Sequence, residues 1–366
     1  MQMVNDIKLD FDDVLVRPQR SATASRKEVD ISRSFKFRNS NQDWSGIPIF
    51  AANMDTTGTF KMVKAFKEYD MYAFLHKHYP VNEICEFIDN GDCENFFYTL
   101  GTGPKDREKL DEVSNRVPIN NICVDVANGY TDFFVERLSE IRRQFPKAII
   151  MAGNVCTPEM VQELVLQGGV DIIKMGIGPG SVCTTRLVAG VGYPQLSAII
   201  ECADAAHGLN AHICADGGCR SPADVVKAFG AGADMVMLGG MLAGTDECEG
   251  EWEWENDIEW GNPNRQGDPF VAAKLKLDGK GKIIQKKKSM KFYGMSSTDA
   301  MKKHNGGIAD YRASEGEAKS IPYKGSVHDV IHEILGGIRS ACAYVGAKTL
   351  KDFSKRTTFV RVSRIK

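Results

Sequence analysis

Residues 121–152 read NICVDVANGYTDFFVERLSEIRRQFPKAIIMA, and they hold one complete unit of the fold. The stretch begins and ends with a short apolar run, and Thr131–Phe145 lies between the two runs. In that segment apolar side chains recur at helical spacing from Phe134 to Phe145, which predicts a helix with one apolar face. An amphipathic helix between two apolar strands is typical of parallel strands joined by a helix that covers the sheet.

The same unit recurs along the chain. Thr157 and Ser221 each precede a proline, a pattern that is typical of the first turn of a helix. Short apolar runs predict strands at residues 48–52, 72–76, 95–100, 121–125, 148–152, 171–176, 211–215 and 235–238. Eight strands that alternate with helices indicate an α/β fold, and specifically a closed (β/α)8 TIM barrel rather than an open doubly wound sheet.

Two regions fall outside this repeat. Residues 1–47 form an N-terminal extension that we expect to cap the bottom of the barrel or to reach a neighbouring subunit. Residues 243–325 interrupt the eighth unit before a final helix near 326–345, and they run from an acidic, Trp-rich start to a Lys-rich QKKKS segment. This composition predicts a flap or a short hairpin at the top of the barrel. We expect residues 1–366 to form a single catalytic domain.

The composition argues against several classes of protein. The formal net charge is −2, so the chain has no overall basic field that would attract nucleic acid or anionic lipid. No apolar run approaches the roughly 20 residues of a membrane-spanning helix, and the first residues do not resemble a signal peptide. The ten cysteines occur singly and without zinc-like spacing, which suits a reducing compartment. We therefore expect a cytoplasmic protein without nucleic-acid or membrane partners.

The most unusual loop is KMGIGPGSVCTTR, which spans Lys174–Arg186 and follows the sixth predicted strand. Its three alternating glycines remove side chains from a turn, so backbone groups can approach a ligand or an ion. Cys183 lies in this loop beside two hydroxyls and the cation of Arg186, surroundings that favour a nucleophilic thiol. A cysteine taken at random is more often an inert, buried side chain, and it is the composition of this loop that favours the nucleophile.

Two further motifs lie at the ends of the last strands and beyond the insertion. ADGG (215–218) and LGG (238–240) follow strands seven and eight, where barrels of this kind usually bind phosphate through backbone N–H groups. Either glycine pair alone would be a plain turn, but together they favour a nucleotide monophosphate, with Asp216 suited to the ribose hydroxyls. GMSS (294–297) and YRASEG (311–316) follow the insertion, and Glu315 could bind a base or transfer a proton. A lone glutamate is more often solvated surface.

Together these segments resemble the IMP dehydrogenase/GMP reductase family over nearly the whole chain. The resemblance is carried by GIGPGSVCTTR (176–186) with GVGYPQLSA (190–198), LDFDDVLVRP (9–18), AANMDT (51–56), DVANGY (125–130), MAGN (151–154), the ADGG-to-LAGT segment (215–245) and RTTFVRV (356–362).

Three features resemble the reductase branch of that family. The regulatory CBS-type domain that the dehydrogenases usually carry between the second helix and the third strand is absent. HKHY (76–79) and CADAAHGL (202–209) are similar to the reductases, and Glu315 stands where the dehydrogenases are expected to carry glutamine. One departure is residues 246–290, a stretch longer than is typical of the reductases, which could alter flap closure, cofactor access or oligomer contacts. Its lysine run is expected to be solvated surface.

The resemblance implies an NADPH-dependent oxidoreductase of purine metabolism that converts GMP to IMP and ammonia through a covalent thioimidate on Cys183. The catalytic residues that it implies are Cys183, Thr185 and Glu315, the last two moving a proton to the departing amine. The implied GMP contacts are Asp216, Gly217, Gly218, Gly239, Gly240, Met295, Ser296, Arg312, Ser314 and Gly316. The implied NADPH contacts are Lys77, Asp125, Val126, Ala127, Gly178 and Tyr311, with Ser25, Arg26, Ser340, Ala341, Cys342 and Ala343 acting across a subunit boundary. The resemblance also implies a homotetramer and a monovalent cation, potassium, held by Gly178, Gly180, Cys183 and Arg186.

Three other interpretations stay open at this stage. An IMP dehydrogenase without its regulatory domain would form the same bond to Cys183, but it would reduce NAD and add water to IMP. A catalytically silent nucleotide-binding regulator would be favoured by replacement of Cys183, Thr185 or Glu315, and all three are present. A flavin- or sugar-phosphate-binding barrel would leave the cysteine loop unexplained.

Overall fold

Eight parallel strands close into a barrel in the order in which they occur in the chain, as the sequence predicts. The computed structural model describes residues 3–91, 94–260, 273–280, 282–307 and 313–363. The barrel strands are β4 (Ile49–Ala51), β5 (Tyr72–Leu75), β6 (Phe96–Leu100), β7 (Asn121–Asp125), β8 (Ile149–Val155), β9 (Ile172–Met175), β10 (His212–Asp216) and β11 (Met235–Leu238), and β11 pairs with β4. β8 runs past its predicted end because Gly153 still pairs with β7 and Val155 with β9.

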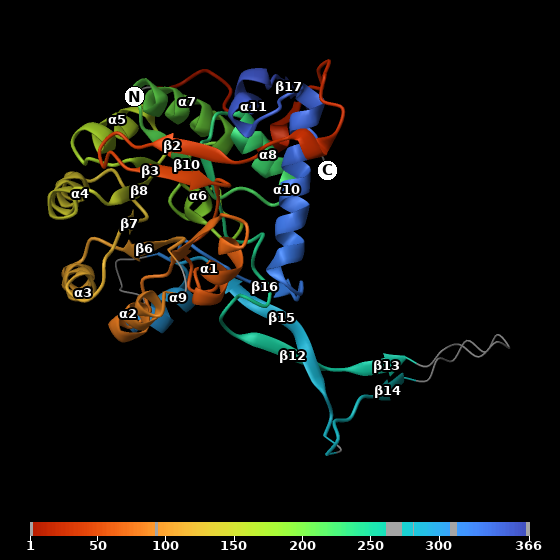
Figure 1. Cartoon of the computed structure of the whole chain (residues 1–366). Helices are drawn as coiled ribbons and strands as arrows, with labels where there is room; N and C mark the ends of the chain where they lie inside the picture. The colour runs from red at the N-terminus through yellow and green to blue at the C-terminus, as the bar shows by residue number, and fades with distance from the viewer. Residues whose placement is uncertain (1–2, 92–93, 261–272, 281, 308–312, 364–366) are drawn as a thin grey trace.

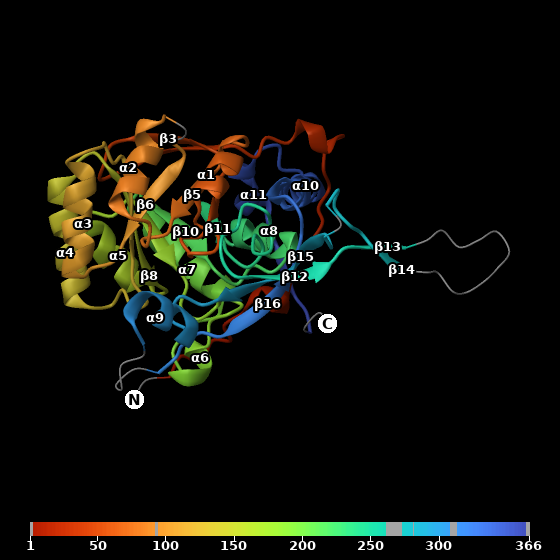
Figure 2. The same cartoon turned by 90° about the horizontal axis from the view of Figure 1, so that it is seen from below.

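Helices surround the barrel, as Figures 1 and 2 show. They are α1 (Phe60–Lys67), α2 (Val81–Asp89), α3 (Pro104–Ser114), α4 (Asp132–Gln144), α5 (Pro158–Leu166), α7 (Gln195–Gly208), α8 (Pro222–Gly230), α10 (Val327–Val345) and α11 (Leu350–Arg356). Thr131 caps α4 by accepting the N–H of Phe134, and the proline that begins α5 and α8 stands in the first turn. The predicted apolar face of α4 is buried against the barrel at Phe134, Leu138 and Ile141. Among the described residues, no helix has the length and apolar character that crossing a membrane would require.

Aromatic side chains fill the barrel and its amino-terminal end. Phe74 and Phe97 stack inside it with ring centroids 4.3 Å apart, and Phe50 packs beside them. A hairpin of the N-terminal extension, β2 (Arg33–Lys36) and β3 (Asp43–Gly46), adds Phe35 and Trp44 to the same buried cluster. The extension also brings β1 (Val14–Val16) against β17 (Phe359–Arg361), so segments from both ends of the chain pair. Since the interior is packed and its lower end is covered, ligands can reach the barrel only from the carboxyl ends of the strands.

Asp234 is a buried carboxylate at the covered end of the barrel. It lies 2.8 Å from Nε2 of His207 and accepts the N–H of Ile213 at 3.1 Å, and Arg33 of the hairpin lies 3.4 Å away. Burial opposes the ionisation of Asp234, but the contacts with His207 and His212 outweigh it and hold its pKa below the ordinary value. The bond to Asp234 in turn raises the pKa of His207.

We expect Asp234→Asn to lower the free energy of unfolding by about 2 kcal/mol, because a charged acceptor of several buried hydrogen bonds is lost. In the wild type, the raised pKa of His207 adds stability that is complete below a pH of about 6.5 and is lost as the pH rises through the folded-state pKa. The contribution of Asp234 itself is lost only as the pH falls below about 3.9, its ordinary pKa. Denaturant unfolding of the wild type and of Asp234→Asn, each in mildly acidic and in mildly alkaline buffer, measures the loss of stability in the variant and the pH-dependent contribution of His207. If the variant kept the wild-type loss of stability between these buffers, the pairing of His207 with Asp234 would not be its cause.

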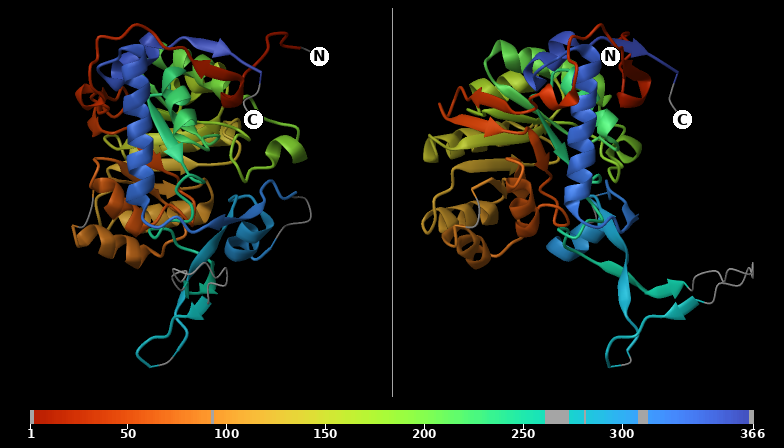
Figure 3. Two further views of the ribbon diagram at one scale, coloured as in Figure 1. Left: turned by 90° about the vertical axis from the view of Figure 1, so that its right-hand side faces the viewer. Right: turned by 45° about the vertical axis from the view of Figure 1, so that its right-hand side comes forward.

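Between β11 and α10 the chain forms a projecting arm and a small helix. A three-stranded antiparallel sheet contains β12 (Trp252–Asn256), β15 (Gln285–Tyr293) and β16 (Ala318–Pro322), and it continues into the pair β13 (Ile258–Trp260) and β14 (Ala273–Leu275). Figures 1 and 3 show this arm extending away from the barrel, while α9 (Thr298–Asn305) stays beside it. Within the lysine run, Lys286 and Lys288 are exposed, whereas Lys287 is partly buried over the ring of Trp252 and bonds to Asp246.

Candidate active site

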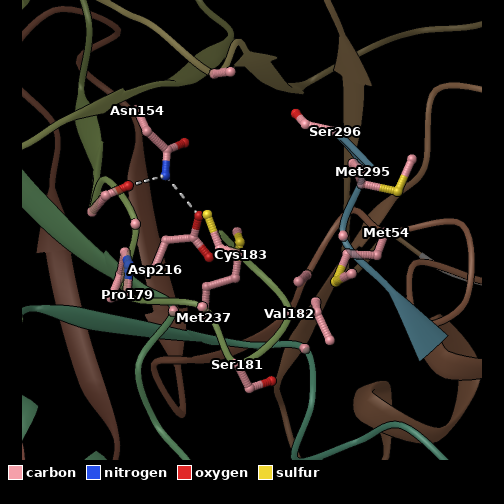
Figure 4. Close-up of a pocket in the computed structure, with 18 of the residues that line it drawn as sticks. Met54, Asn154, Pro179, Ser181, Val182, Cys183, Asp216, Met237, Met295 and Ser296 are labelled. Atoms are coloured by element: carbon pink, nitrogen blue, oxygen red, sulfur yellow. Dashed lines mark hydrogen bonds between the residues drawn. The ribbon is translucent and has the colours of Figure 1, made fainter. Parts of the chain in front are cut away.

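A cavity of about 250 Å³ opens at the carboxyl ends of the barrel strands. The predicted catalytic and substrate residues that line it are Cys183, Thr185, Glu315, Asp216, Gly217, Gly218, Gly239, Gly240, Met295 and Ser296. Figure 4 shows Cys183, Asp216 and Asn154 on one side of the cavity and Met295 and Ser296 on the other. Strand ends, the cysteine loop and the segment after β15 therefore meet around one space, although they lie far apart in the sequence.

Cys183, Thr185 and Glu315 form a chain of contacts at this cavity. Sγ of Cys183 lies 3.3 Å from Oγ1 of Thr185, and that hydroxyl donates to Oε2 of Glu315 at 2.8 Å. Thr185 and Glu315 are 130 positions apart in the chain. Backbone pairing brings them together, because the N–H of Thr184 donates to the carbonyl of Glu315 at 3.0 Å and the N–H of Glu317 donates to Val182 at 2.9 Å.

Two of the predicted GMP contacts hold the loop around Glu315 rather than line the cavity. The hydroxyl of Ser314 accepts the N–H of Thr298 at 3.1 Å and donates to the carbonyl of Gly316 at 3.0 Å. A Cβ on Gly316 would lie 3.1 Å from the backbone nitrogen of Ser297, so the loop packs closely on the start of α9. Arg312 and Tyr311 lie outside the described residues.

The two glycine pairs give the cavity a backbone-lined wall. Gly217 and Gly218 have φ angles of +84° and +86°, a conformation that side chains with a Cβ rarely adopt. A Cβ on Gly240 would lie 2.9 Å from Oγ of Ser181, which itself lines the cavity. Side chains are therefore excluded from both pairs, and backbone N–H groups with a nearby hydroxyl suit the oxygens of a phosphate.

A second cavity of about 370 Å³ adjoins the first. The predicted cofactor residues Lys77, Asp125, Val126 and Ala127 line it. Asp125, Val126 and Ala127 line the first cavity too, as do Met295 and Ser296, so the two spaces share a wall. Gly178, a further predicted cofactor residue, lines the first cavity but not the second. Two adjoining cavities can hold a nucleotide and a second ligand side by side.

Asp55 fixes the end of the projecting insertion to the barrel beside the second cavity. It accepts hydrogen bonds from Tyr293 at 2.7 Å, Lys303 at 2.9 Å and His304 at 2.8 Å. Burial opposes the ionisation of Asp55, but these three bonds outweigh it and lower its pKa. The ring of His304 stacks on His78, with centroids 3.5 Å apart, and both line the second cavity. Burial, followed by the neighbouring His304, lowers the pKa of His78 to about 4, so His78 is neutral near neutral pH.

With this geometry in view, comparison with known protein families matches residues 8–260 and 270–365 to the IMP dehydrogenase / GMP reductase domain. The chain belongs to this family. It is similar to GMP reductase 2 of Homo sapiens, with 54% identity over 98% of this chain and 96% of that protein, and to GMP reductase 1 of Homo sapiens, with 53% identity over the same shares. It is 49% identical to the GMP reductase of Yersinia enterocolitica over 99% of this chain and 97% of that protein. The family match leaves out residues 261–269, which lie within the stretch that the sequence marks as longer than usual.

The segments that the family resemblance places at a subunit boundary line neither cavity. Ser25 and Arg26 are exposed, and the short helix η2 (Arg26–Glu28) packs against α10, which carries residues 340–343. The structure therefore brings these two segments to one surface. Cys342 is fully buried in the core of this chain, so its side chain is not available to a nucleotide, whereas its neighbours are partly exposed. Their contact with a cofactor in another subunit stays a prediction.

Arg186 holds the cysteine loop in place. Its guanidinium donates to Asp10 at 2.9 Å and to the carbonyl of Tyr193 at 2.5 Å, and a Cβ on Gly178 would lie 2.6 Å from its side chain. Within the loop, the carbonyl of Gly180 accepts the N–H of Cys183 at 3.1 Å. These residues come from one tight loop, and their binding of a cation stays a prediction. Among the described residues, no group of three or more His, Cys, Asp or Glu side chains could hold a metal ion.

Neither Lys174 nor Asn154 is among the predicted catalytic, substrate or cofactor residues, and the structure places both in the wall of the first cavity. Lys174 stands inside the otherwise apolar strand β9, IIKM, and Asn154 follows a glycine near the end of β8. A charged residue within a buried strand was the signal that could have identified Lys174, because such a charge needs partners in the interior.

Proposed function

We propose that this chain is a GMP reductase, which converts GMP to IMP and ammonia with NADPH as the reductant. The observation that carries the proposal is the chain of contacts from Cys183 through Thr185 to Glu315 at the wall of the barrel cavity. Full-length similarity to reductases of this name, at 49–54% identity, supports it.

The contacts suggest how the protein's own residues handle the proton. The hydroxyl of Thr185 donates to Glu315, so a lone pair on its oxygen can accept the thiol proton of Cys183 while the hydroxyl proton moves to the carboxylate. The thiolate then forms a bond to C2 of the purine. The same path in reverse delivers the proton to the amine on C2, the C2–N bond breaks and ammonia leaves. When bound, NADPH would supply a hydride to C2; the C2–S bond then breaks to give IMP, and the released Cys183 thiolate takes up a proton.

The two cavities suit the two ligands of this reaction. In the first, the glycine pairs would bind the GMP phosphate. Asn154 and Lys174 both bind Oδ2 of Asp216, so Oδ1 can accept the ribose hydroxyls. The second cavity would hold the nicotinamide side of NADPH, next to Asp125 and Lys77 on the shared wall. The shared wall would let NADPH bound in the second cavity supply its hydride to a purine bound in the first.

We extend the proposal to a potassium ion and a homotetramer. The loop of residues 178–183 offers neutral carbonyl oxygens on a backbone with few side chains, the ligand type that suits a monovalent cation. The exposed Ser25–Arg26 segment and residues 340–343 share one surface, which would meet the cofactor of a neighbouring subunit.

Nicotinamide absorbance tests the activity. The purified chain is mixed with GMP and NADPH, and a parallel sample receives IMP and NAD. We expect loss of NADPH with release of ammonia in the first sample and no change in the second. Formation of NADH from IMP would instead make the chain an IMP dehydrogenase without its regulatory domain.

A further inference from the structure

Lys174 connects the walls of the two cavities. Its side chain is 5% exposed, and its Nζ lies 2.9 Å from Oδ1 of Asp125, 2.8 Å from Oδ1 of Asn154 and 2.5 Å from Oδ2 of Asp216. These three acceptors come from β8 and β10, which flank β9 in the closed barrel, and from β7, which lies beyond β8. Asn154 adds a second bond to Oδ2 of Asp216 at 2.8 Å and one to the carbonyl of Gly176 at 2.8 Å.

An ammonium group has three N–H donors, and here each one faces a protein acceptor. Lys174 therefore has no donor left for a ligand, and any effect on ligands must pass through its partners. Those partners face different spaces, because Asp216 lines the first cavity whereas Asp125 lines both. One cation thus sets the position of one carboxylate at the nucleotide site and of another at the cofactor site.

The charges make this arrangement depend on Lys174. Burial favours the neutral amine, but Asp125 and Asp216 outweigh it and raise the pKa of Lys174, so it stays charged. Burial also opposes the ionisation of Asp125, and Lys174 reverses that effect and lowers the pKa. Without the lysine, two carboxylates would lie in one partly buried wall with no cation between them, an arrangement that is strongly unfavourable. A ligand that draws either carboxylate towards itself changes the bond that the lysine makes to the other.

We propose that Lys174 is a positioning residue that couples the two cavities, so that nucleotide bound in the first changes the affinity of the second for NADPH. The inference rests on the proposed function, which supplies the identity of the two ligands. Coupling between two sites is reciprocal, so the same factor must appear in the affinity for nucleotide when the cofactor is present.

Calorimetry measures this coupling without turnover. NADPH is titrated into the full-length protein with and without saturating IMP, a pair that cannot react because C2 of IMP already carries the hydrogen that NADPH would deliver. We expect the dissociation constant for NADPH to change by roughly tenfold with IMP in the wild type, as is typical of coupled sites. In Lys174→Met the ratio should fall close to one, and Lys174→Arg, which keeps the charge, should restore part of it.

Lys227→Met is the matched control. Lys227 is also a buried lysine and donates to the carbonyl of Phe11 at 2.9 Å, but it lines neither cavity, so its loss should leave the coupling unchanged. Asp125→Asn provides a second variant if Lys174→Met does not fold. It should lower the coupling and the affinity for NADPH while changing the affinity for IMP little.

Two results would overturn the inference. One is equal coupling in the wild type and in Lys174→Met, or in Asp125→Asn where that variant is used. The other is a wild type that binds both ligands without any coupling, which would leave the proposed function intact. A wild type that neither binds IMP nor oxidises NADPH with GMP would overturn the proposed function and the inference together.

Discussion

Glu315→Gln is expected to lower the turnover number for GMP reduction by a factor of about 10²–10⁴, the range that positioned acid–base groups contribute. Glutamine has nearly the shape of glutamate, and its carbonyl oxygen can still accept the hydroxyl of Thr185 that now donates at 2.8 Å. An amide cannot take up the thiol proton or return it to the leaving amine. The expected result is therefore slow release of ammonia from a site that still binds GMP within a few-fold of the wild-type affinity.

Ammonia release and NADPH oxidation are measured in parallel, with calorimetry of GMP binding on the same preparations. Glu317→Gln is the matched control, because Glu317 lies two positions away, is exposed and pairs with Lys319 at 2.8 Å. That control should turn over GMP at nearly the wild-type rate. If Glu315→Gln released ammonia at the wild-type rate, Glu315 would have no role in proton transfer. A large loss of GMP binding would instead indicate that Glu315 binds the substrate.

The barrel could be predicted from the sequence because its pattern is local. Each strand is a short apolar run, and a capping residue before a proline marks the start of helices such as α5 and α8. The end of β8 was missed because Gly153 and Asn154 interrupt the apolar run, although the strand goes on pairing with its neighbours. Gly153 is buried and paired but carries no apolar side chain, so a hydrophobic pattern cannot mark it as part of the strand.

The candidate site depends on contacts between distant segments, which pattern alone does not provide. Thr185 and Glu315 meet through backbone pairing of two loops, and only the family resemblance placed them together. The partners of Lys174 depend on which strands are neighbours and on how far each extends, so the sequence shows an odd lysine but not the carboxylates around it. A family motif also does not show which of its side chains are exposed: Cys342 lies in the predicted cofactor segment with its side chain buried in the core, and its contact with a cofactor stays a prediction.

Cys183→Ala is expected to reduce GMP turnover by roughly 10⁴-fold or more, the order seen when a nucleophile is removed from an enzyme that uses covalent catalysis. Alanine has no thiol and cannot form the bond to C2. Cys219 also lines the cavity, but burial raises the pKa of its thiol, which disfavours the nucleophilic thiolate. Cys219→Ala is therefore the matched control and should keep most of the turnover.

Binding separates the role of Cys183 as a nucleophile from a role in shaping the cavity. The contact between the Cys183 thiol and Thr185 belongs to the proposed proton path, while the glycine pairs and Asp216 form other parts of the wall. Calorimetry should therefore find that Cys183→Ala binds GMP with an affinity close to that of the wild type, while mass spectrometry of the wild type quenched during turnover should detect a purine nucleotide bound covalently to Cys183. If Cys183→Ala lost both GMP binding and turnover, the side chain would be needed to shape the pocket. The drop in rate could then not be assigned to the missing covalent bond. Substantial turnover by Cys183→Ala would contradict the covalent route altogether, since ammonia would then leave without the step that we propose Thr185 and Glu315 to assist.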